Sequence, residues 1–221
     1  MKREEMAEFI KTQTVLEKPS FVPEITLQLA TEVTPIWKLT EERLKGGDLP
    51  PPFWAFAWPG GQGLARYILD NPDVVKGKCV LDFAAGCGIA AIAAAKAGAK
   101  LSLADDIDLL AQEAVLINAA HNGVKVEIYR VMSMDKPFTG ADLIILGDVC
   151  YQQAMSTAIM RWLTLCLEIG VRILIADPGR AYVPKDGMKE LARYTVPTTL
   201  ELEDQKTREV VVWELEGFGG C

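Results

Sequence analysis

Short apolar runs recur along the second part of the chain, and a helical pattern follows all but one of them. The five runs occupy residues 79–83, 100–104, 126–131, 141–146 and 172–176. Helical patterns cover residues 89–97, a segment that ends near Ala120, residues 154–168 and residues 188–194. Strands that are apolar throughout and alternate with helices are typical of a parallel sheet covered on both faces.

The two ends of the chain follow other patterns. Residues 198–203 and 209–215 are β-rich and are joined by polar residues, which predicts an antiparallel hairpin. Near the start, residues 1–16 fit an amphipathic helix, and the alternation around Leu27 fits a short strand. The prolines at 50–52 then break the chain.

Length and pattern together predict one large domain with a short extension, since a domain usually has about 100–200 residues. We expect an N-terminal extension at residues 1–50 and a Rossmann-like, doubly wound α/β domain at residues 51–221. Its sheet is expected to have seven strands, mostly parallel, with an antiparallel C-terminal hairpin. In such folds ligands bind at the carboxyl ends of the parallel strands.

Charge and residue usage narrow the class of protein. The 23 Lys and Arg against 30 Asp and Glu give a net charge of −7, which disfavours nucleic acid as a partner. The five cysteines form no CxxC pair and read as reduced thiols, and with His121 as the single histidine we predict no metal site. No signal, transit or membrane-spanning segment is expected, so we predict a cytoplasmic protein, with a monomer favoured.

The glycine-containing turn after the first strand of the domain is the first sign of chemistry. Asp82 lies in the strand, Gly86 and Gly88 follow it, and Asp106 ends the next strand. A nicotinamide-binding loop would have a third glycine where Ala91 stands. The pattern instead resembles motif I of the class I S-adenosylmethionine-dependent methyltransferases, although Ala84 replaces that family's first loop glycine.

Four further segments extend this resemblance from about Val22 to Arg180. Asp148-Val149-Cys150-Tyr151 matches the D-x-x-Y of the seven-strand protein-lysine methyltransferases. The segments 52–62 with 70–75 and 176–180 resemble one subfamily, the electron-transfer-flavoprotein β-subunit lysine methyltransferases. The resemblance implies S-adenosylmethionine as the cofactor, lysine side chains of a protein as the target, and that β subunit as the favoured substrate.

The resemblance and the predicted fold also imply a set of site residues. Asp148 and Tyr151 are the candidate catalytic residues, and Trp54 and Arg180 are candidates for contact with the substrate. The candidate cofactor-binding residues are Trp58, Asp82, Gly86, Gly88, Asp106, Ile107, Ser133, Met134 and Gly147.

Methyl transfer needs a neutral amine, and a lysine with a pKa of about 10.4 is almost entirely charged near neutral pH. A carboxylate stabilises the ammonium that it would have to deprotonate, so Asp148 is a poor base. We expect it to orient the amine and to stabilise the positive charge that grows on the nitrogen. Tyr151 could offer a ring face or a hydroxyl to the same cation.

Other readings remain open from the sequence. Asp148 could cap the following helix with Tyr151 packed beneath it, and Arg180 could hold its loop by a salt bridge. The acids at 201–204 read as a solvated face. For the whole protein, the rival functions are a ribosomal-protein lysine methyltransferase, a small-amine N-methyltransferase and a non-catalytic regulator that binds S-adenosylmethionine.

Overall fold

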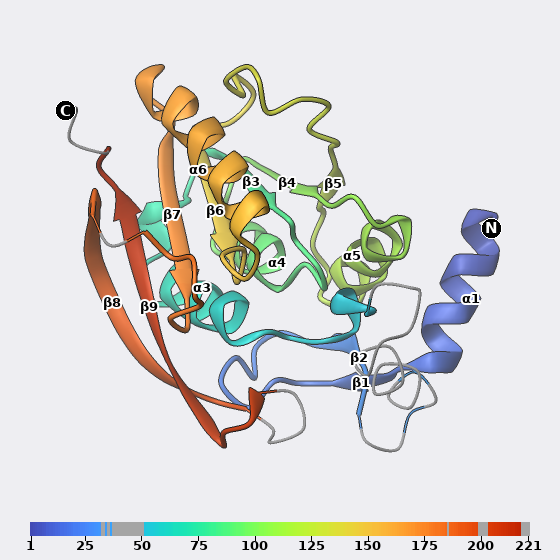
Figure 1. The fold of residues 1–221 in the computed structure, drawn as a ribbon. Coiled ribbons are helices and arrows are strands. Elements are labelled where there is room, and N and C mark those ends of the chain that lie inside the picture. Colours follow the sequence, from blue (N-terminus) through green and yellow to red (C-terminus); the bar gives the residue numbers. More distant parts are fainter. Residues whose placement is uncertain (32–33, 35, 37–50, 185, 199–202, 218–221) are drawn as a thin grey trace.

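The computed structural model describes residues 1–31, 34, 36, 51–184, 186–198 and 203–217. Within them, seven strands form one sheet in the order β5-β4-β3-β6-β7-β9-β8 (Figure 1). The strands are β3 (Cys79–Phe83), β4 (Leu101–Asp105), β5 (Glu127–Ile128), β6 (Leu143–Gly147), β7 (Arg172–Asp177), β8 (Met188–Pro197) and β9 (Thr207–Leu215). The first five are parallel, whereas β9 runs antiparallel to both β7 and β8. The expected fold class is confirmed.

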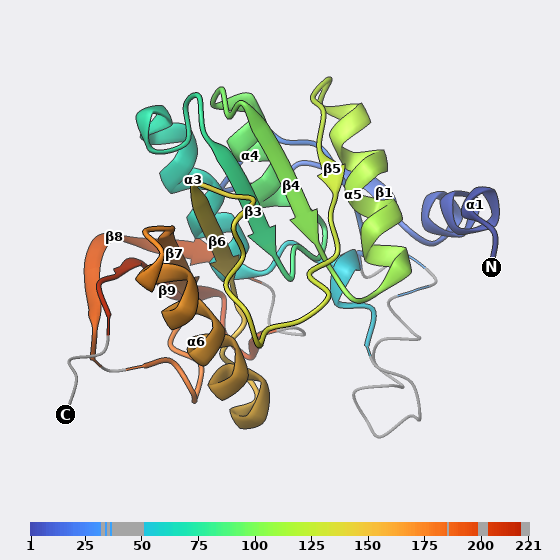
Figure 2. The ribbon, with the colours of Figure 1, turned by 90° about the horizontal axis from the view of Figure 1, so that it is seen from above.

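Helices cover both faces of this sheet, as the view from above shows (Figure 2). The helices α3 (Pro59–Asp70), α4 (Ile89–Lys96) and α5 (Leu109–His121) lie on one face, and α6 (Gln153–Glu168) lies on the other. Alternate strand residues divide between the two layers: Ile145 and Leu174 pack towards α3 and α4, whereas Ile144 and Ile173 pack towards α6. Because both faces are buried, the parallel strands are mostly apolar, and their buried acids Asp82, Asp105 and Asp177 are each held by backbone N–H groups.

The first thirty residues pack against this domain. Helix α1 (Arg3–Gln13) is tied to α5 by an ion pair of 2.7 Å between Arg3 Nε and Glu113 Oε2. Strands β1 (Val15–Glu17) and β2 (Leu27–Leu29) form a separate antiparallel pair. The Gln28 backbone N–H donates to Asn118 Oδ1 at 2.7 Å, which joins β2 to α5. Most of the expected extension beyond this point, residues 37–50, lies outside the described residues.

The second strand of the C-terminal hairpin is β9, close to the predicted residues 209–215, but its first strand, β8, begins ten residues earlier than expected. The predicted helix at residues 188–194 is wrong, since these residues belong to β8 and pair with β9 from Met188 to Pro197. The cross-strand hydrogen bonds to β9, together with β-formers such as Tyr194 and Val196, decide the conformation. Most of the strand predicted at residues 198–203, namely 199–202, lies outside the described residues.

The described part of the chain contains no helix that is both long enough and apolar enough to cross a bilayer. Cys79, Cys87, Cys150 and Cys166 are free thiols.

Candidate functional site

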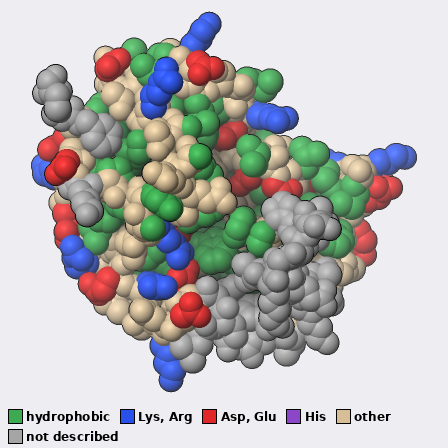
Figure 3. All heavy atoms as spheres, viewed as in Figure 1, with side chains coloured by type: hydrophobic (Ala, Val, Ile, Leu, Met, Phe, Trp, Pro, Cys, Tyr) green, Lys and Arg blue, Asp and Glu red, His purple; other side chains and the backbone are tan. Residues whose placement is uncertain are grey.

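The carboxyl ends of β3, β4, β6 and β7 meet at one edge of the sheet, and most of the predicted site residues lie there. The short 3₁₀ helix η1 (Phe53–Ala55) precedes α3, and the carbonyl oxygen of Phe53 lies close to Gly86 in the loop that follows β3. In the space-filling view, hydrophobic side chains gather around a hollow in the middle of this face of the molecule (Figure 3).

The loop between β3 and α4 has a left-handed backbone at three positions. Gly86 and Gly88 have φ values of 54° and 78°, which glycine adopts without strain. A side chain at Gly88 would also come within 2.9 Å of Val115 Cγ2. Asp82, buried in β3, accepts a hydrogen bond of 2.9 Å from the Ala91 N–H in the first turn of α4. Asp82 thus holds the loop and the helix N-terminus in place.

Ala84 has the third left-handed backbone, with a φ of 58°. This conformation strains a residue with a Cβ by about 1–2 kcal/mol, and glycine relieves it at some loss of unfolded-state entropy. We expect Ala84→Gly to raise the free energy of unfolding by up to about 1 kcal/mol, or about 2–4 °C in Tm. Thermal unfolding followed by circular dichroism measures the change. Ala85→Gly, beside it but without a left-handed φ, should lower Tm instead.

The buried Asp82 also makes stability depend on pH. Burial, with the charges of Asp106 and Asp105 adding to it, raises the pKa of Asp82 from 3.8 to about 7. A carboxyl whose pKa is raised in the folded state contributes most to the free energy of unfolding below about pH 4. That contribution is lost as the pH rises through about 7.

Asn at this position keeps an acceptor for the Ala91 N–H but carries no charge. We therefore expect Asp82→Asn to gain stability relative to the wild type between pH 5 and pH 8. Urea unfolding of both proteins at pH 5 and pH 8 tests this. If the variant and the wild type differ in free energy of unfolding by the same amount at both pH values, Asp82 does not titrate in this range.

Two neighbouring acids at the end of β4 organise the same region. Asp106 accepts backbone hydrogen bonds from Gly86 at 2.9 Å and Asp108 at 3.0 Å, which ties β4 to the glycine loop. Asp105 is buried, accepts from the Val131 N–H at 2.7 Å, and has its pKa raised by burial to about 6. Sequence reasoning overlooked Asp105, although two acids in succession at a strand end were the available signal.

Asp148 lies directly after β6 and has a left-handed φ of 56°. Its Oδ2 accepts a hydrogen bond from the Gly60 N–H at the start of α3, where the helix dipole favours a negative charge. Its Oδ1 accepts from Arg180 Nε and Nη2 at 3.1 and 2.8 Å. Burial raises the pKa of Asp148 above its usual value, and the Arg180 guanidinium opposes this rise. These contacts rule out the simple capping reading, because the carboxylate binds α3 and Arg180.

Arg180, predicted either to contact substrate or to hold its loop, forms ion pairs with two acids. Besides Asp148, it binds Glu203 through Nη1 and Nη2 at 3.0 and 2.5 Å. Glu203 is only 3% exposed, so reading residues 201–204 as a solvated face was wrong for this residue. Nearby Asp177 is fully buried and accepts the Gly179 and Arg180 N–H groups; burial raises its pKa to about 7.

Aromatic rings line the same edge. Phe53 is 39% exposed, and its ring centroid lies 5.9 Å from that of Trp58 and 5.7 Å from that of Tyr151. Tyr151 itself is 42% exposed, and burial and the charge of Asp106 raise its pKa. Phe53, which the sequence did not single out, thus joins two of the predicted residues. We call Phe53, Trp58 and Tyr151 the aromatic wall.

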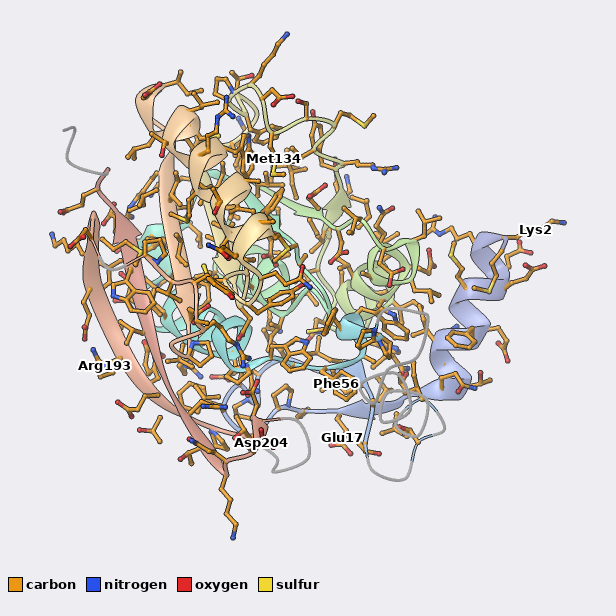
Figure 4. All side chains as sticks on the ribbon, in the orientation of Figure 1. Lys2, Glu17, Phe56, Met134, Arg193 and Asp204 are labelled. Carbon is orange, nitrogen blue, oxygen red and sulfur yellow. The ribbon has the colours of Figure 1, made fainter. Side chains whose placement is uncertain are left out.

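Trp54 does not belong to this wall. It is 1% exposed and packs in a core cluster with Ile10 and Ala111, so no face of its ring is open to a protein substrate. Phe56 is buried in the same cluster and is labelled near η1 in Figure 4. Trp54, Phe56 and Trp58 stand two residues apart in the sequence, and this spacing does not distinguish the buried rings of Trp54 and Phe56 from the partly exposed ring of Trp58.

The remaining predicted cofactor residues are spread more widely. Ile107 is 87% exposed after β4, an apolar surface available to a flat ligand. Gly147 packs on α3, since a Cβ there would lie 2.8 Å from the Gly61 N. Met134 packs against the core on the α6 side, away from Phe56 in Figure 4, and Ser133 is exposed and bonded to Asp135 at 3.0 Å.

The strand order, the glycine loop after β3 and the acids at the carboxyl ends of β4 and β6 define a class I S-adenosylmethionine-dependent methyltransferase. Two solved structures share the fold. A putative RNA methyltransferase from Pyrococcus horikoshii matches with a TM-score of 0.54 and 16% identity, over 83% of this chain and 97% of that one. A Thermoplasma acidophilum protein matches with a TM-score of 0.52 and 18% identity, over 72% of this chain and 91% of that one. The family model described as ribosomal protein L11 methyltransferase (PrmA) matches residues 65–149.

Relatives in sequence identify the family within this class. The chain is 38% identical to the rat electron transfer flavoprotein beta subunit lysine methyltransferase, over 90% of this chain and 80% of the relative. It is 40% identical to the human protein of that name, over 80% of this chain and 67% of the human one. It is 33% identical to the Caenorhabditis elegans homolog, over 95% of this chain and 96% of the homolog. The chain belongs to the electron transfer flavoprotein beta subunit lysine methyltransferase family.

Proposed function

We propose that this enzyme transfers methyl groups from S-adenosylmethionine to lysine side chains of the electron transfer flavoprotein β subunit. The observation that carries the proposal is the position of the aromatic wall beside the glycine loop, with Asp148 at the carboxyl end of β6, the strand next to β3. If a side chain were added at Gly86, its Cβ would lie 4.0 Å from the Phe53 carbonyl oxygen, so η1 borders the loop directly. The names of the relatives support the β subunit as the substrate.

The residues at the end of β4 and in the glycine loop fit this cofactor. We propose that the Asp106 carboxylate accepts the ribose hydroxyls, since oxygens that already accept N–H groups retain further lone pairs. Ile107 offers apolar surface to the adenine, and Trp58, Gly86 and Gly88 border the rest. Ser133, Met134 and Gly147 remain predicted contacts. When bound, the cofactor supplies an electrophilic methyl group on a sulfonium.

The chain's own residues would then prepare the amine. Asp148 sits in a largely dehydrated position, 9% exposed, where a hydrogen bond to a developing ammonium is stronger than in water. The faces of Phe53 and Tyr151 can receive the same cation, because aromatic rings attract positive charge at about 6 Å or less. Desolvation by these rings favours the neutral form of the lysine, which is the form that attacks.

The direct test is methyl transfer from labelled S-adenosylmethionine to purified flavoprotein, followed by mass spectrometry of the β subunit. We expect label on lysines of the β subunit and none on the other subunit. A ribosomal protein should be tested beside it, because the ribosomal protein L11 methyltransferase model covers the core at residues 65–149. Label on that protein alone would discard the proposed substrate and keep the reaction.

Asp106→Ala is expected to weaken cofactor binding by at least about tenfold, because two ribose hydroxyls would lose their charged acceptor. Isothermal titration calorimetry with S-adenosylhomocysteine measures the dissociation constant. Asp108→Ala is the matched control, since its carboxylate caps α5 through the Leu110 N–H. A control that weakened binding equally would show that the loop's fold, and not the Asp106 carboxylate, is what the ligand requires.

We also propose that the enzyme works in the cytoplasm as a monomer, without nucleic acid or membrane partners. The free thiols among the described residues support a reducing compartment, and the net charge of −7 disfavours nucleic acid. Cell fractionation and light scattering test the compartment and the oligomeric state.

A further inference from the structure

Four charged side chains form a continuous chain of alternating sign at the edge of the site. Asp148 binds Arg180, Arg180 binds Glu203, and Glu203 Oε2 accepts from Arg208 Nε at 3.0 Å. The two acids have side chains that are 9% and 2% exposed. Burying charges is unfavourable unless each is paired and hydrogen-bonded, and this cluster balances two positive against two negative charges.

The members of this cluster come from three separate parts of the chain. Asp148 follows β6, Arg180 follows β7, and Glu203 and Arg208 belong to the β8–β9 connection and the start of β9. In Figure 4 the neighbouring Asp204 lies at the lower end of β9, on the same side of the molecule as Phe56. Through its ion pair with Arg180, Glu203 therefore reaches the site, although nothing in the sequence around Glu203 resembles a functional motif.

The contacts of Asp148 fix its carboxylate from both sides. Gly60 donates to Oδ2, while two nitrogens of Arg180 donate to Oδ1. The guanidinium is a rigid planar fork, so its own direction is set by its second partner, Glu203. A carboxylate has about four acceptor positions, which leaves room for one more donor.

We propose that Arg180 is a positioning residue for Asp148, and that Glu203 holds Arg180 in the orientation which leaves Asp148 ready to accept the substrate amine. This rests on the proposed role of Asp148. Arg180 would then act through Asp148 and would not itself contact the substrate, which replaces the substrate-binding role expected from the sequence.

The charges that face Asp148 agree with such a role. Arg180 is the positive group and Glu203 and Asp177 are the acids in its surroundings. Burial raises the pKa of Asp148 and Arg180 counteracts the rise, so the arginine helps keep the carboxylate ionised. Burial opposes the charge of Arg180 too, yet its hydrogen bonds to Glu203 and the charge of Asp148 raise its pKa.

Arg180→Met and Arg180→Lys separate the two contributions of the arginine. Methionine removes the charge, so we expect kcat to fall at least tenfold and the acidic limb of the kcat–pH profile to move to higher pH. Lysine keeps the charge without the fork, so the profile should return to its wild-type position while kcat recovers only in part. KM for the protein substrate and the dissociation constant of S-adenosylhomocysteine should stay within about threefold in both variants.

Glu203→Gln tests the outer member of the cluster with little change of shape, and should lower kcat at least threefold. Glu214→Gln is the matched control, since Glu214 binds Arg172 with the same chemistry at the other end of β7, at 2.6 and 3.0 Å. It should leave kcat unchanged. Circular dichroism of all variants establishes that they are folded.

A higher kcat or a lower KM in Arg180→Met would overturn the proposal, because Arg180 would then be a cation that the substrate lysine has to displace. Full activity and an unmoved pH profile in Arg180→Met and Glu203→Gln would overturn it as well. Asp148→Asn, assayed in parallel, tells the two levels apart. If Asp148→Asn is fully active, the proposed role of Asp148 fails. If Asp148→Asn is inactive while Arg180→Met and Glu203→Gln are fully active, only the positioning role of Arg180 and Glu203 fails.

Discussion

Asp148→Asn is expected to lower kcat by about 100-fold or more while S-adenosylhomocysteine still binds with nearly unchanged affinity. Removing a preorganised group that faces a developing charge typically reduces kcat by about 10²–10³-fold. Asparagine suits the left-handed backbone at this position, where φ is 56°, so the main change is the loss of the negative charge. Single-turnover methylation and calorimetry measure the two quantities.

The same substitution disturbs the fold only locally. An amide presents its NH₂ group either to the Gly60 N–H or to Arg180, which costs about 1–3 kcal/mol of stability for the unsatisfied groups. Asp142→Asn is a suitable control, because Asp142 precedes the opposite end of β6 and also accepts a backbone N–H, from Cys79 at 2.8 Å. It should retain full activity. Turnover near the wild-type rate in Asp148→Asn would rule out an ionic role for this residue.

Gly60→Ala is expected to have the largest effect on stability. An added Cβ would lie 2.5 Å from both the Ala176 carbonyl oxygen and Asp148 Oδ2, and 2.8 Å from the Asp148 N. Two of these neighbours are backbone atoms of packed strands, so α3 has to move away from the sheet. Overpacking of this kind destabilises a protein by about 1–3 kcal/mol or more, and it would also displace the carboxylate that Gly60 binds.

Gly61→Ala, one position further along α3, provides the comparison. There the added Cβ would meet only Ile89 Cγ2, at 3.2 Å, and alanine favours the helix by up to about 1 kcal/mol. We expect Gly61→Ala to keep both Tm and activity, while Gly60→Ala loses several degrees of Tm and most of its turnover. Equal Tm values for the two variants would show that α3 tolerates a shift at its N-terminus.

The parallel half of the sheet could be predicted from the sequence because burial on both faces makes consecutive residues of a strand mostly apolar. This holds for β3, β6 and β7, whose bounds differ from the predicted ones by two residues at most. The segment 188–194 could not be assigned in the same way. One face of β8 is open to solvent, and its strand conformation depends on pairing with β9, a contact that no local pattern reveals.

The same distinction applies to the site. Residues held by local geometry, such as Asp82, Gly86 and Asp106, could be found because strand, loop and helix follow one another in the chain. Glu203 could not be found, since its burial depends on Arg180 and Arg208, and those ion pairs form only in the folded protein. Phe53 and Trp54 are neighbours with opposite exposure, set by how η1 lies over the core.

The position of β9 between β7 and β8 has a consequence for folding on the ribosome. The parallel strands and α3 are complete once Asp177 has emerged, but β8 has no partner in the sheet until β9 follows it. Until then the nascent chain exposes the edge of β7 and the α3 surface that Val210 later covers, a state open to pairing with other chains. Arg180 also lacks its partner Glu203 until then, so the ion pairs that hold the Asp148 carboxylate are complete only once Arg208, at the start of β9, has been made.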